Sequence, residues 1–333
     1  MLTQEEIAQK VGLSRMTVYR YLTGQTVSRK TKETLDSFLK ESSYRPNLTA
    51  RSLVSRKTNL IGLLVPSVHY SYYPHIIQTI QSELRMNGYN VILSVSNDNT
   101  VEEWDEINLM LSIPVDGLIV SPVSSVESER SIQLLKENNI PFVLVDRRME
   151  KIKCPFVGTD ARKYSKLIVN YLVENGHRRI AHIGGPEENS FSADMYSGYI
   201  DAMTENNLTV DQRHVLRGDI SEDTGRTSMK LLCQMKDGPT AIQAVNDTVA
   251  LGALRYASEN DVRVPESVSL VGFSDIALSS IVCVPFTTVR EDTTLMGIEA
   301  VSILLKNISQ KRRRNTVKLL DGELIVRKSV AAR

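Results

Sequence analysis

Arg15, Met16 and Thr17 have side chains that can contact the edges of DNA bases, and Arg20 follows a turn and a half further along. The Arg20 guanidinium could reach either a base or a phosphate. These residues can act together only at the start of a helix that enters the major groove, as the second helix of a helix-turn-helix does. The possible chemistry is therefore hydrogen bonding to a duplex, and it depends on the elements that the chain forms there.

Two short helices joined by a tight turn are predicted over residues 3–22. Thr3 and Glu6 have the spacing of a capping box, in which each side chain satisfies a backbone N–H group of the other. Gly12 can adopt the left-handed conformation that ends a helix, and Ser14 can cap the helix that follows. The pattern is typical of a helix-turn-helix, although an amphipathic helix pair buried in a core fits the same residues.

Charge patterning favours the DNA-binding interpretation. Residues 1–57 carry a net charge of +6, and the remaining residues carry −5. The overall charge of +1 is therefore the sum of a basic N-terminal region and an acidic remainder. Such a distribution suits phosphate binding by one end of the chain.

Two further segments extend the predicted DNA-binding region. Ser28 can cap a third helix that closes a three-helix headpiece. Pro46 rules out a continued helix at the residue before it, and Asn47 can cap a short helix that includes Ala50 and Leu53. That helix is too short to be stable alone, and a plain linker fits the same sequence.

Length and composition suit a small domain followed by a larger one of two lobes. The 333 residues are 41% hydrophobic and 24% charged, which is ordinary for a globular protein. The longest apolar run, about residues 60–66, is far shorter than a membrane helix, and the N-terminus has no signal-peptide core. Cys154, Cys233 and Cys283 fit neither a disulfide framework nor a zinc site. We expect a cytoplasmic protein with no membrane partner.

From residue 59, buried strands alternate with amphipathic helices in two successive series. This predicts an α/β fold with two lobes, each built on a parallel sheet covered on both faces. In such sheets ligands bind beyond the carboxyl ends of the strands. Polar residues occupy these ends at Ser67, Ser121, Asp146, Asn246, Asp247, Ser274 and Asp275. The cleft between the lobes is therefore the expected ligand site.

Several motifs extend these observations along the whole chain. They include residues 12–20 (GLSRMTVYR), 44–53 (YRPNLTARSL), 59–62 (NLIG), 176–181 (GHRRIA), 184–186 (GGP), 246–252 (NDTVALG), 271–273 (VGF) and 287–289 (TTV). In this order they resemble the lactose/galactose repressor (LacI/GalR) family of bacterial transcription regulators. Several independent motifs make the resemblance specific, whereas a helix-turn-helix alone would be a weak signal.

The resemblance implies a helix-turn-helix headpiece at residues 1–57, with a hinge helix at about 47–55. It also implies a two-lobed core at 59–333 that is similar to periplasmic binding proteins. Lobe 1 would span about 59–158 and 289–318, and lobe 2 about 159–287 and 319–333. The implied DNA-binding residues are Thr3, Ser14, Arg15, Met16, Thr17, Arg20, Ser28, Asn47, Ala50 and Leu53.

The family binds pseudo-palindromic double-stranded operators as a dimer. Leu53 matches the family leucine that wedges into the central base step of the minor groove. A small molecule in the cleft changes the lobe geometry, and so orders or releases the hinge helices. Family tetramers carry a leucine-heptad helix after the core, but residues 317–333 have no heptads, so a homodimer is expected.

Matching family positions give the candidate effector-binding residues His69, Tyr72, Tyr73, Ser121, Asp146, Ala193, Asn246, Ser274 and Thr293. Two of them depart from the family pattern. Ala193 replaces an arginine that clamps sugar hydroxyls, and Ser274 replaces an aspartate. With that aspartate gone, and with Arg147, Arg162 and Lys163 near the lobe junction, a sugar acid or sugar phosphate is favoured over a neutral sugar.

Three alternatives remain open from the sequence. The effector could be a partner protein, as in some family members, or the core could be an enzyme or a transport sugar-binding protein. The fused headpiece and the absent signal peptide oppose transport. Enzyme chemistry is opposed because no nucleophile-base set, phosphate loop or metal cluster is evident, and no catalytic residue, metal or cofactor is expected. A ligand-responsive repressor of a carbohydrate or sugar-acid operon is the leading hypothesis.

Overall fold

The computed structural model describes residues 3–22, 25–42, 57–69, 72–310 and 314–333. The chain divides into two compact units, an N-terminal unit (Met1–Thr58) and a C-terminal unit (Asn59–Arg333). The predicted hinge helix at about 47–55, with Asn47, Ala50 and Leu53, lies outside the described residues.

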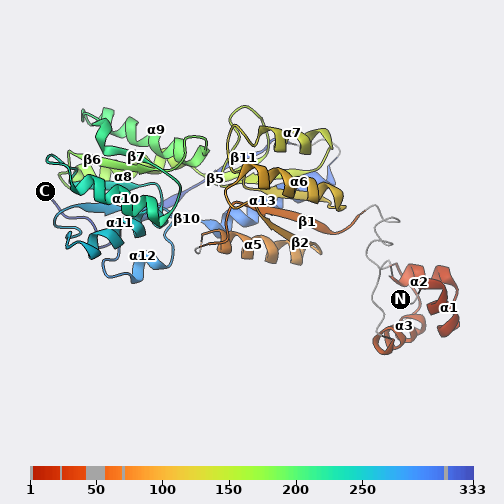
Figure 1. The fold of residues 1–333 in the computed structure, drawn as a ribbon. Coiled ribbons are helices and arrows are strands. Elements are labelled where there is room, and N and C mark those ends of the chain that lie inside the picture. Colours follow the sequence, from red (N-terminus) through yellow and green to blue (C-terminus); the bar gives the residue numbers. More distant parts are fainter. Residues whose placement is uncertain (1–2, 23–24, 43–56, 70–71, 311–313) are drawn as a thin grey trace. The chain divides into compact units, whose positions relative to one another are not determined.

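The N-terminal unit contains three helices, α1 (Gln4–Val11), α2 (Arg15–Leu22) and α3 (Arg29–Glu41) (Figure 1). Their caps form as predicted. Thr3 and Glu6 make a complete capping box, and Gly12 ends α1 with φ at +67°. The Ser14 hydroxyl accepts a hydrogen bond from the Thr17 N–H group at 3.1 Å, and Ser28 caps α3. The turn between α1 and α2 is therefore built by the residue types that the sequence places there.

A small apolar core holds these three helices together. Ile7 of α1, Val18 of α2 and Leu35 of α3 are each fully buried. The Tyr21 hydroxyl also donates a hydrogen bond to Asp36, which joins α2 to α3 and raises the pKa of Tyr21 to about 12. One face of α2 is thus fixed against its neighbours, and its other face is left for contacts outside the unit.

Lobe 1 of the C-terminal unit is built on a six-stranded parallel sheet in the order β11-β5-β4-β3-β1-β2. Its strands are β1 (Leu60–Val65), β2 (Asn90–Val95), β3 (Gly117–Val120), β4 (Phe142–Val145), β5 (Phe156–Thr159) and β11 (Val317–Leu320). Its helices are α5 (Tyr72–Met86), α6 (Thr100–Ser112), α7 (Glu129–Glu137) and α13 (Thr293–Ser309). Successive β1 residues face opposite sides: Leu63 packs in the cluster under α5 and α13, and Leu64 in the cluster under α6 and α7.

Lobe 2 is built on a four-stranded parallel sheet in the order β7-β6-β8-β9. Its strands are β6 (Ile180–Gly184), β7 (Val215–Arg217), β8 (Ala241–Ala244) and β9 (Ser269–Val271). Its helices are α8 (Ala161–Glu174), α9 (Ser190–Glu205), α10 (Glu222–Cys233), α11 (Asp247–Glu259) and the short α12 (Leu278–Ile281), and η1 (Gln212–His214) is a 3-10 turn. Helices α8 and α9 pack together, as do α10 and α11, so both sheet faces are covered.

Three segments pass between the lobes. The chain crosses first from β5 to α8, then through β10 (Thr288–Glu291) to α13, and finally from β11 to β12 (Gly322–Ile325). Strands β10 and β12 pair antiparallel, with Val289 opposite Leu324. Among the described residues, no helix combines the length and the apolar character that crossing a membrane requires. The observed α/β architecture with parallel sheets agrees with the predicted fold class.

Candidate functional site

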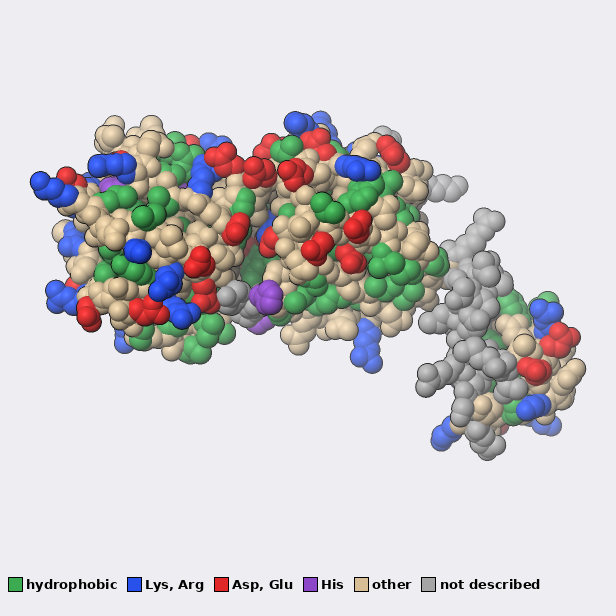
Figure 2. All heavy atoms as spheres, in the orientation of Figure 1, with side chains coloured by type: hydrophobic (Ala, Val, Ile, Leu, Met, Phe, Trp, Pro, Cys, Tyr) green, Lys and Arg blue, Asp and Glu red, His purple; other side chains and the backbone are tan. Residues whose placement is uncertain are grey.

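A cavity of about 480 Å³ lies where the carboxyl ends of strands from both lobes meet. Figure 2 shows the groove between the lobes, with acidic side chains along both of its rims. Six of the predicted effector-binding residues line the cavity, namely His69, Tyr72, Tyr73, Asp146, Asn246 and Ser274. The structure thus brings these six together, and their contact with a ligand remains a prediction.

Asp146, Tyr72 and Tyr73 form the lobe 1 side of this cavity. Asp146 follows β4, and the two tyrosines begin α5. Tyr72 donates a hydrogen bond to Asp146 Oδ1 at 2.8 Å, and Tyr73 donates one to Oδ2 at 2.6 Å. Burial raises the pKa of Asp146, although the neighbouring Arg147 and both hydroxyls oppose the shift. Ser121, a predicted cavity residue, instead lies behind Tyr73 and bonds its hydroxyl at 3.0 Å.

Glu291 adds a buried carboxyl that the sequence analysis did not single out. It ends β10, and only 5% of its surface is exposed. Its Oε2 accepts a hydrogen bond from Ser274 at 3.2 Å, and its Oε1 lies 3.3 Å from the Tyr72 hydroxyl. Burial and then the charge of Asp146 raise the pKa of Glu291 to about 8. A carboxyl therefore stands next to Ser274, where the family aspartate is missing.

This arrangement gives no support to the expectation of an anionic ligand. Arg147 does line the cavity, but it bonds Asp98 at 2.8 Å and is 6% exposed, so its charge is already paired. Arg162 binds Asp201, and Lys163 binds Asp321, and neither lines the cavity. An anion would meet carboxyl groups with no free cation among the cavity-lining residues that the structure describes.

Asn246 and Asp247 form the lobe 2 wall at the start of α11. The Asn246 side chain caps the helix by accepting from the Val249 N–H group at 3.0 Å. Asp247 is fully buried and accepts from the Thr288 hydroxyl at 2.6 Å and from the Ile276 N–H group at 2.9 Å. Burial raises the pKa of Asp247 to about 7, although both hydrogen bonds oppose the shift.

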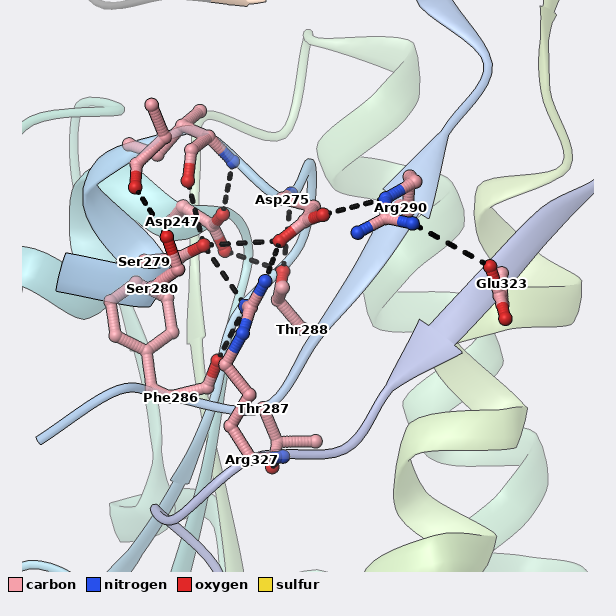
Figure 3. A network of polar contacts seen from close by, with 12 residues as sticks. Asp247, Asp275, Ser279, Ser280, Phe286, Thr287, Thr288, Arg290, Glu323 and Arg327 are labelled. Carbon is pink, nitrogen blue, oxygen red and sulfur yellow. Dashed lines mark hydrogen bonds and ion pairs between the residues drawn. The ribbon is translucent and has the colours of Figure 1, made fainter.

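A second carboxylate, Asp275, anchors the loop after β9 to the segments that cross between the lobes. Asp275 accepts hydrogen bonds from Arg290 at 2.7 Å and from Arg327 at 2.5 Å (Figure 3). These two guanidinium groups lower the pKa of Asp275, although burial opposes them. The position of this loop is thus coupled to β10 and to the chain after β12.

Backbone strain collects in the same part of the molecule. Asp146 has φ at +66°, Ser274 at +112° and Asp275 at +49°. Non-glycine residues seldom adopt such angles, and they persist only where surrounding contacts over-determine them. Here the contacts are the hydrogen bonds of Asp146, Ser274 and Asp275, so strain and polar network occur together at the cavity.

Two other predicted effector residues lie outside this cavity. Ala193 is in the first turn of α9, and Thr293, at the start of α13, lines a separate cavity of about 540 Å³. The two cavities share Tyr72, Ser274, Ile276 and Glu291. Thr293 is therefore placed on the far side of the wall that these shared residues form.

The remaining cavity-lining residues are Ser67, Asp98, Arg147, Asn189, Phe191, Ile220, Ser221, Asp247, Thr248, Ile276 and Glu291. Ser67 and Asp247 were visible as polar strand ends. Arg147 was expected near the lobe junction. Apart from Glu291, which ends β10, the others lie on loops and helix starts, and no spacing in the sequence distinguishes them from ordinary surface residues. Glu291 follows the alternation of a half-buried strand.

The two lobes also contact each other directly beside the cavity. Arg148 forms a two-point ion pair with Asp194, with one of its nitrogens 3.0 Å from Asp194 Oδ1. The Ser125 N–H group donates to the Glu188 carbonyl at 2.6 Å. Any change in lobe geometry must lengthen or break these contacts.

In the N-terminal unit, most of the predicted base-contacting residues lie on the exposed face of α2. Ser14, Arg15, Met16 and Arg20 are exposed, with Met16 60% exposed, and Thr17 is half-buried. Thr3 and Ser28 are exposed caps of α1 and α3. The described part of the chain contains no group of three or more histidine, cysteine, aspartate or glutamate residues suited to a metal ion.

Comparisons with known proteins match this architecture. A model of a periplasmic binding protein-like domain matches residues 169–330. The HTH-type transcriptional repressor PurR of Erwinia tasmaniensis is 30% identical over 99% of this chain and 97% of its own length. The probable HTH-type transcriptional regulator EndR of Paenibacillus polymyxa is 29% identical over 93% of this chain and 92% of its own length.

Solved structures of transcription regulators have the same fold as this chain. The Lac repressor dimer bound to operator and the anti-inducer ONPF superposes with a TM-score of 0.89 at 26% identity, covering 99% of both chains. The transcriptional regulator CelR in complex with cellobiose superposes with a TM-score of 0.76 at 28% identity, covering 99% of this chain and 100% of that one.

A helix-turn-helix followed by a two-lobed binding core defines a ligand-responsive, DNA-binding transcription regulator. The chain belongs to the LacI/GalR family. The family resemblance and the functional class predicted from the sequence are thereby confirmed. Because the family consists of transcription regulators, the chain is not an enzyme.

Proposed function

We propose that this protein is a cytoplasmic repressor that binds a pseudo-palindromic operator as a homodimer, with α2 in the major groove. The observation that carries the proposal is the asymmetry of α2. Val18 is fully buried against α1 and α3, whereas Arg15 and Met16 at its start are exposed. This is the arrangement that a recognition helix needs in order to reach base edges.

Exposed apolar side chains of the C-terminal unit support a homodimer. Met86 of α5 and Ile281 of α12 are 72% and 74% exposed, and Leu93 of β2 is also exposed. Large apolar side chains on a surface favour burial against a partner.

The effector that the cavity supports is a small polyhydroxyl molecule such as a sugar. A volume of about 480 Å³ falls within the usual range for small-molecule sites, which favours this class over a partner protein. Tyrosine, asparagine, serine and carboxyl groups line it, and all of them can bond hydroxyl groups. A relative, CelR, was solved with cellobiose. Control of a carbohydrate operon is consistent with such a ligand.

Fluorescence anisotropy with a selected operator and a panel of neutral sugars tests this proposal. An effector should change operator affinity of the full chain at least several-fold. Asn246→Ser should weaken the response to the sugar while leaving operator affinity without sugar unchanged, because serine also caps α11. Asn260→Ser, at the other end of α11, is the matched control. If sugars change the operator affinity of Asn246→Ser as much as that of the parent protein, the effector does not bind in this cavity.

A further inference from the structure

Glu291 occupies an unusual place in the cavity wall. It is almost completely buried, yet it lines both the 480 Å³ cavity and the 540 Å³ cavity behind it. A carboxyl group removed from water needs hydrogen-bond donors or a cation to compensate for lost hydration. The donors and cations around Glu291 therefore determine what it can bind.

The described donors around an ionised Glu291 are a few neutral hydroxyl groups and include no cation. The Tyr72 hydroxyl has one proton and lies between two carboxyl oxygens, 2.8 Å from Asp146 Oδ1 and 3.3 Å from Glu291 Oε1. The shorter contact gives that proton to Asp146. When Glu291 is ionised, Oε2 has the Ser274 hydroxyl at 3.2 Å and Thr159 supplies a further hydroxyl to the carboxylate, whereas the Tyr72 proton beside Oε1 is already used by Asp146. A further donor beside Oε1 would complete the set.

The balance of acidic and basic groups, each taken in its ionised form, leads to the same conclusion. Four carboxyl groups line the cavity, namely those of Asp98, Asp146, Asp247 and Glu291, against the single guanidinium of Arg147. Arg147 bonds Asp98 at 2.8 Å and lies 3.8 Å from Asp146. Arg147 therefore pairs with Asp98 and Asp146 but not with Glu291. The cavity wall beside Tyr72 and Ser274 has more carboxyl groups than basic groups.

We propose that the effector carries a protonated amine, and that this ammonium group docks beside Glu291 and Asp146. The proposal rests on the proposed function, since it identifies the chemical class of the ligand that enters the cavity. An ammonium group has three donors and one positive charge, which are the two things that this wall lacks. An amino sugar or an amino polyol fits a cavity whose other groups bond hydroxyls.

Proton linkage gives the proposal a distinctive signature. Without ligand the pKa of Glu291 is about 8, so the group is mainly protonated at pH 7. An ammonium ion lowers that pKa, so binding releases a proton and the affinity rises as pH increases toward 8. A neutral sugar produces no such coupling.

The groups around Glu291 come from four elements, and Asp247, which lines the same cavity with a pKa of about 7, is separated from Glu291 by the comparison with Glu291→Gln. Tyr72 of α5 remains protonated, because its own pKa is raised well above the usual value by burial. Asp146 and Arg147 follow β4, and Thr159 ends β5. After β9, Ser274 is uncharged and Asp275 is paired with Arg290 and Arg327. His75 lines only the cavity behind Glu291, as does Asp292, which caps α13.

The test uses the full chain and pairs of probes that differ in one group. Each hexose or alditol is compared with its analogue in which a terminal hydroxymethyl becomes an aminomethyl group, since a lysine-like amine stays largely protonated at pH 8.5. Sugar acids form a third set. Thermal shift identifies binders, and calorimetry in two buffers of different ionisation enthalpy measures the number of protons released.

At least one amine should bind more tightly than its hydroxyl parent, and its affinity should rise about tenfold or more from pH 6.5 to 8.5. Proton release at pH 7 should approach one per ligand. Glu291→Gln should remove both the pH dependence and the release. Glu103→Gln is the matched control, because Glu103 is also a buried glutamate with a raised pKa but does not line the cavity.

Preference for neutral sugars or sugar acids, or the absence of any amine binder, would overturn the ammonium assignment. An amine that binds with unchanged pH dependence in Glu291→Gln would overturn it as well. Neither result affects the DNA-binding function, which fails only if no symmetric operator is selected.

Discussion

Ser274 and Glu291 are joined by a hydrogen bond of 3.2 Å between Oγ and Oε2, which links the loop after β9 to the strand that crosses into lobe 1. The family resemblance implies an aspartate at the position of Ser274. Glu291 brings a carboxyl to the same place from the neighbouring strand, so the cavity keeps its acidic character. The loss of one acidic residue in the sequence is therefore not a loss of acidity in the site.

A double-mutant cycle can measure this relationship. Ser274→Asp would place two carboxyl groups at hydrogen-bond distance in a buried wall, so we expect it to lower the free energy of unfolding by about 1–3 kcal/mol. In the Glu291→Gln background the same change should cost much less, because the amide can donate to the new carboxylate. Urea unfolding of the four proteins gives the coupling energy, and additive effects would refute the compensation.

The stability of the protein should depend on the protonation of Glu291. Its pKa is near 4 when the chain is unfolded and about 8 when folded, so the native state holds the proton more tightly. The contribution of Glu291 to stability is therefore greatest below about pH 4 and is lost as pH rises from about 4 to 8.

Glu291→Gln should remove up to roughly 3 kcal/mol of the stability loss between pH 6 and pH 8.5. Urea unfolding at both pH values measures the difference, with Glu150→Gln on an exposed loop as control. Parallel pH profiles for the parent and Glu291→Gln proteins would show that the carboxyl ionises normally. Asp247, whose pKa is about 7, contributes a similar loss at lower pH in both proteins.

The Arg148–Asp194 ion pair should control the opening of the lobes more than it controls global stability. Arg148 is partly exposed, so Arg148→Ala should change the free energy of unfolding by less than about 1 kcal/mol. Hydrogen exchange in the loop containing Ser125, which bonds Glu188 across the cleft, should become faster. Arg255→Ala removes a comparable pair within lobe 2 and should leave that loop unchanged. Equal hydrogen-exchange rates of the Ser125 loop in the two variants would show that the Arg148–Asp194 pair does not hold the lobes together.

Sequence reasoning found those features that depend on local chemistry. The caps at Thr3, Ser14 and Ser28, and the buried strands such as Leu60–Val65, follow from residue type and spacing, which act over a few residues. The strand-end rule likewise placed Asp146 correctly at the cavity.

The charge balance of the cavity could not be found in this way. Glu291 meets Asp146 and Ser274 only because β10 crosses between lobes, and Arg147 is neutralised by Asp98, which is 49 positions away. Such pairings depend on tertiary structure and have no local signal. Ala193 and Thr293 do not line this cavity for the same reason: Asn189 and Phe191 reach it from the start of α9 but Ala193 does not, and Thr293 lines the neighbouring cavity.

DNA binding by the N-terminal unit should weaken steeply with salt. Each phosphate that a lysine or arginine neutralises adds roughly 0.9 to the slope of log affinity against log salt. Arg15→Ala should reduce discrimination between operator and altered half-sites by about 1–3 kcal/mol, because Arg15 is exposed at the start of α2, where we propose that it contacts a base edge. Anisotropy titrations at several salt concentrations measure both quantities. An Arg15→Ala protein that changes only the salt slope would show that Arg15 contacts phosphate instead.

Selection of binding sites from random duplex DNA by the full-length protein tests the central claim most directly. A dimeric repressor that reads DNA with α2 should enrich a pseudo-palindrome whose half-sites are related by two-fold symmetry. The enriched sequence should lose its preference at the base that Arg15 contacts when the selection is repeated with Arg15→Ala. Enrichment of no symmetric sequence by the parent protein would contradict the account.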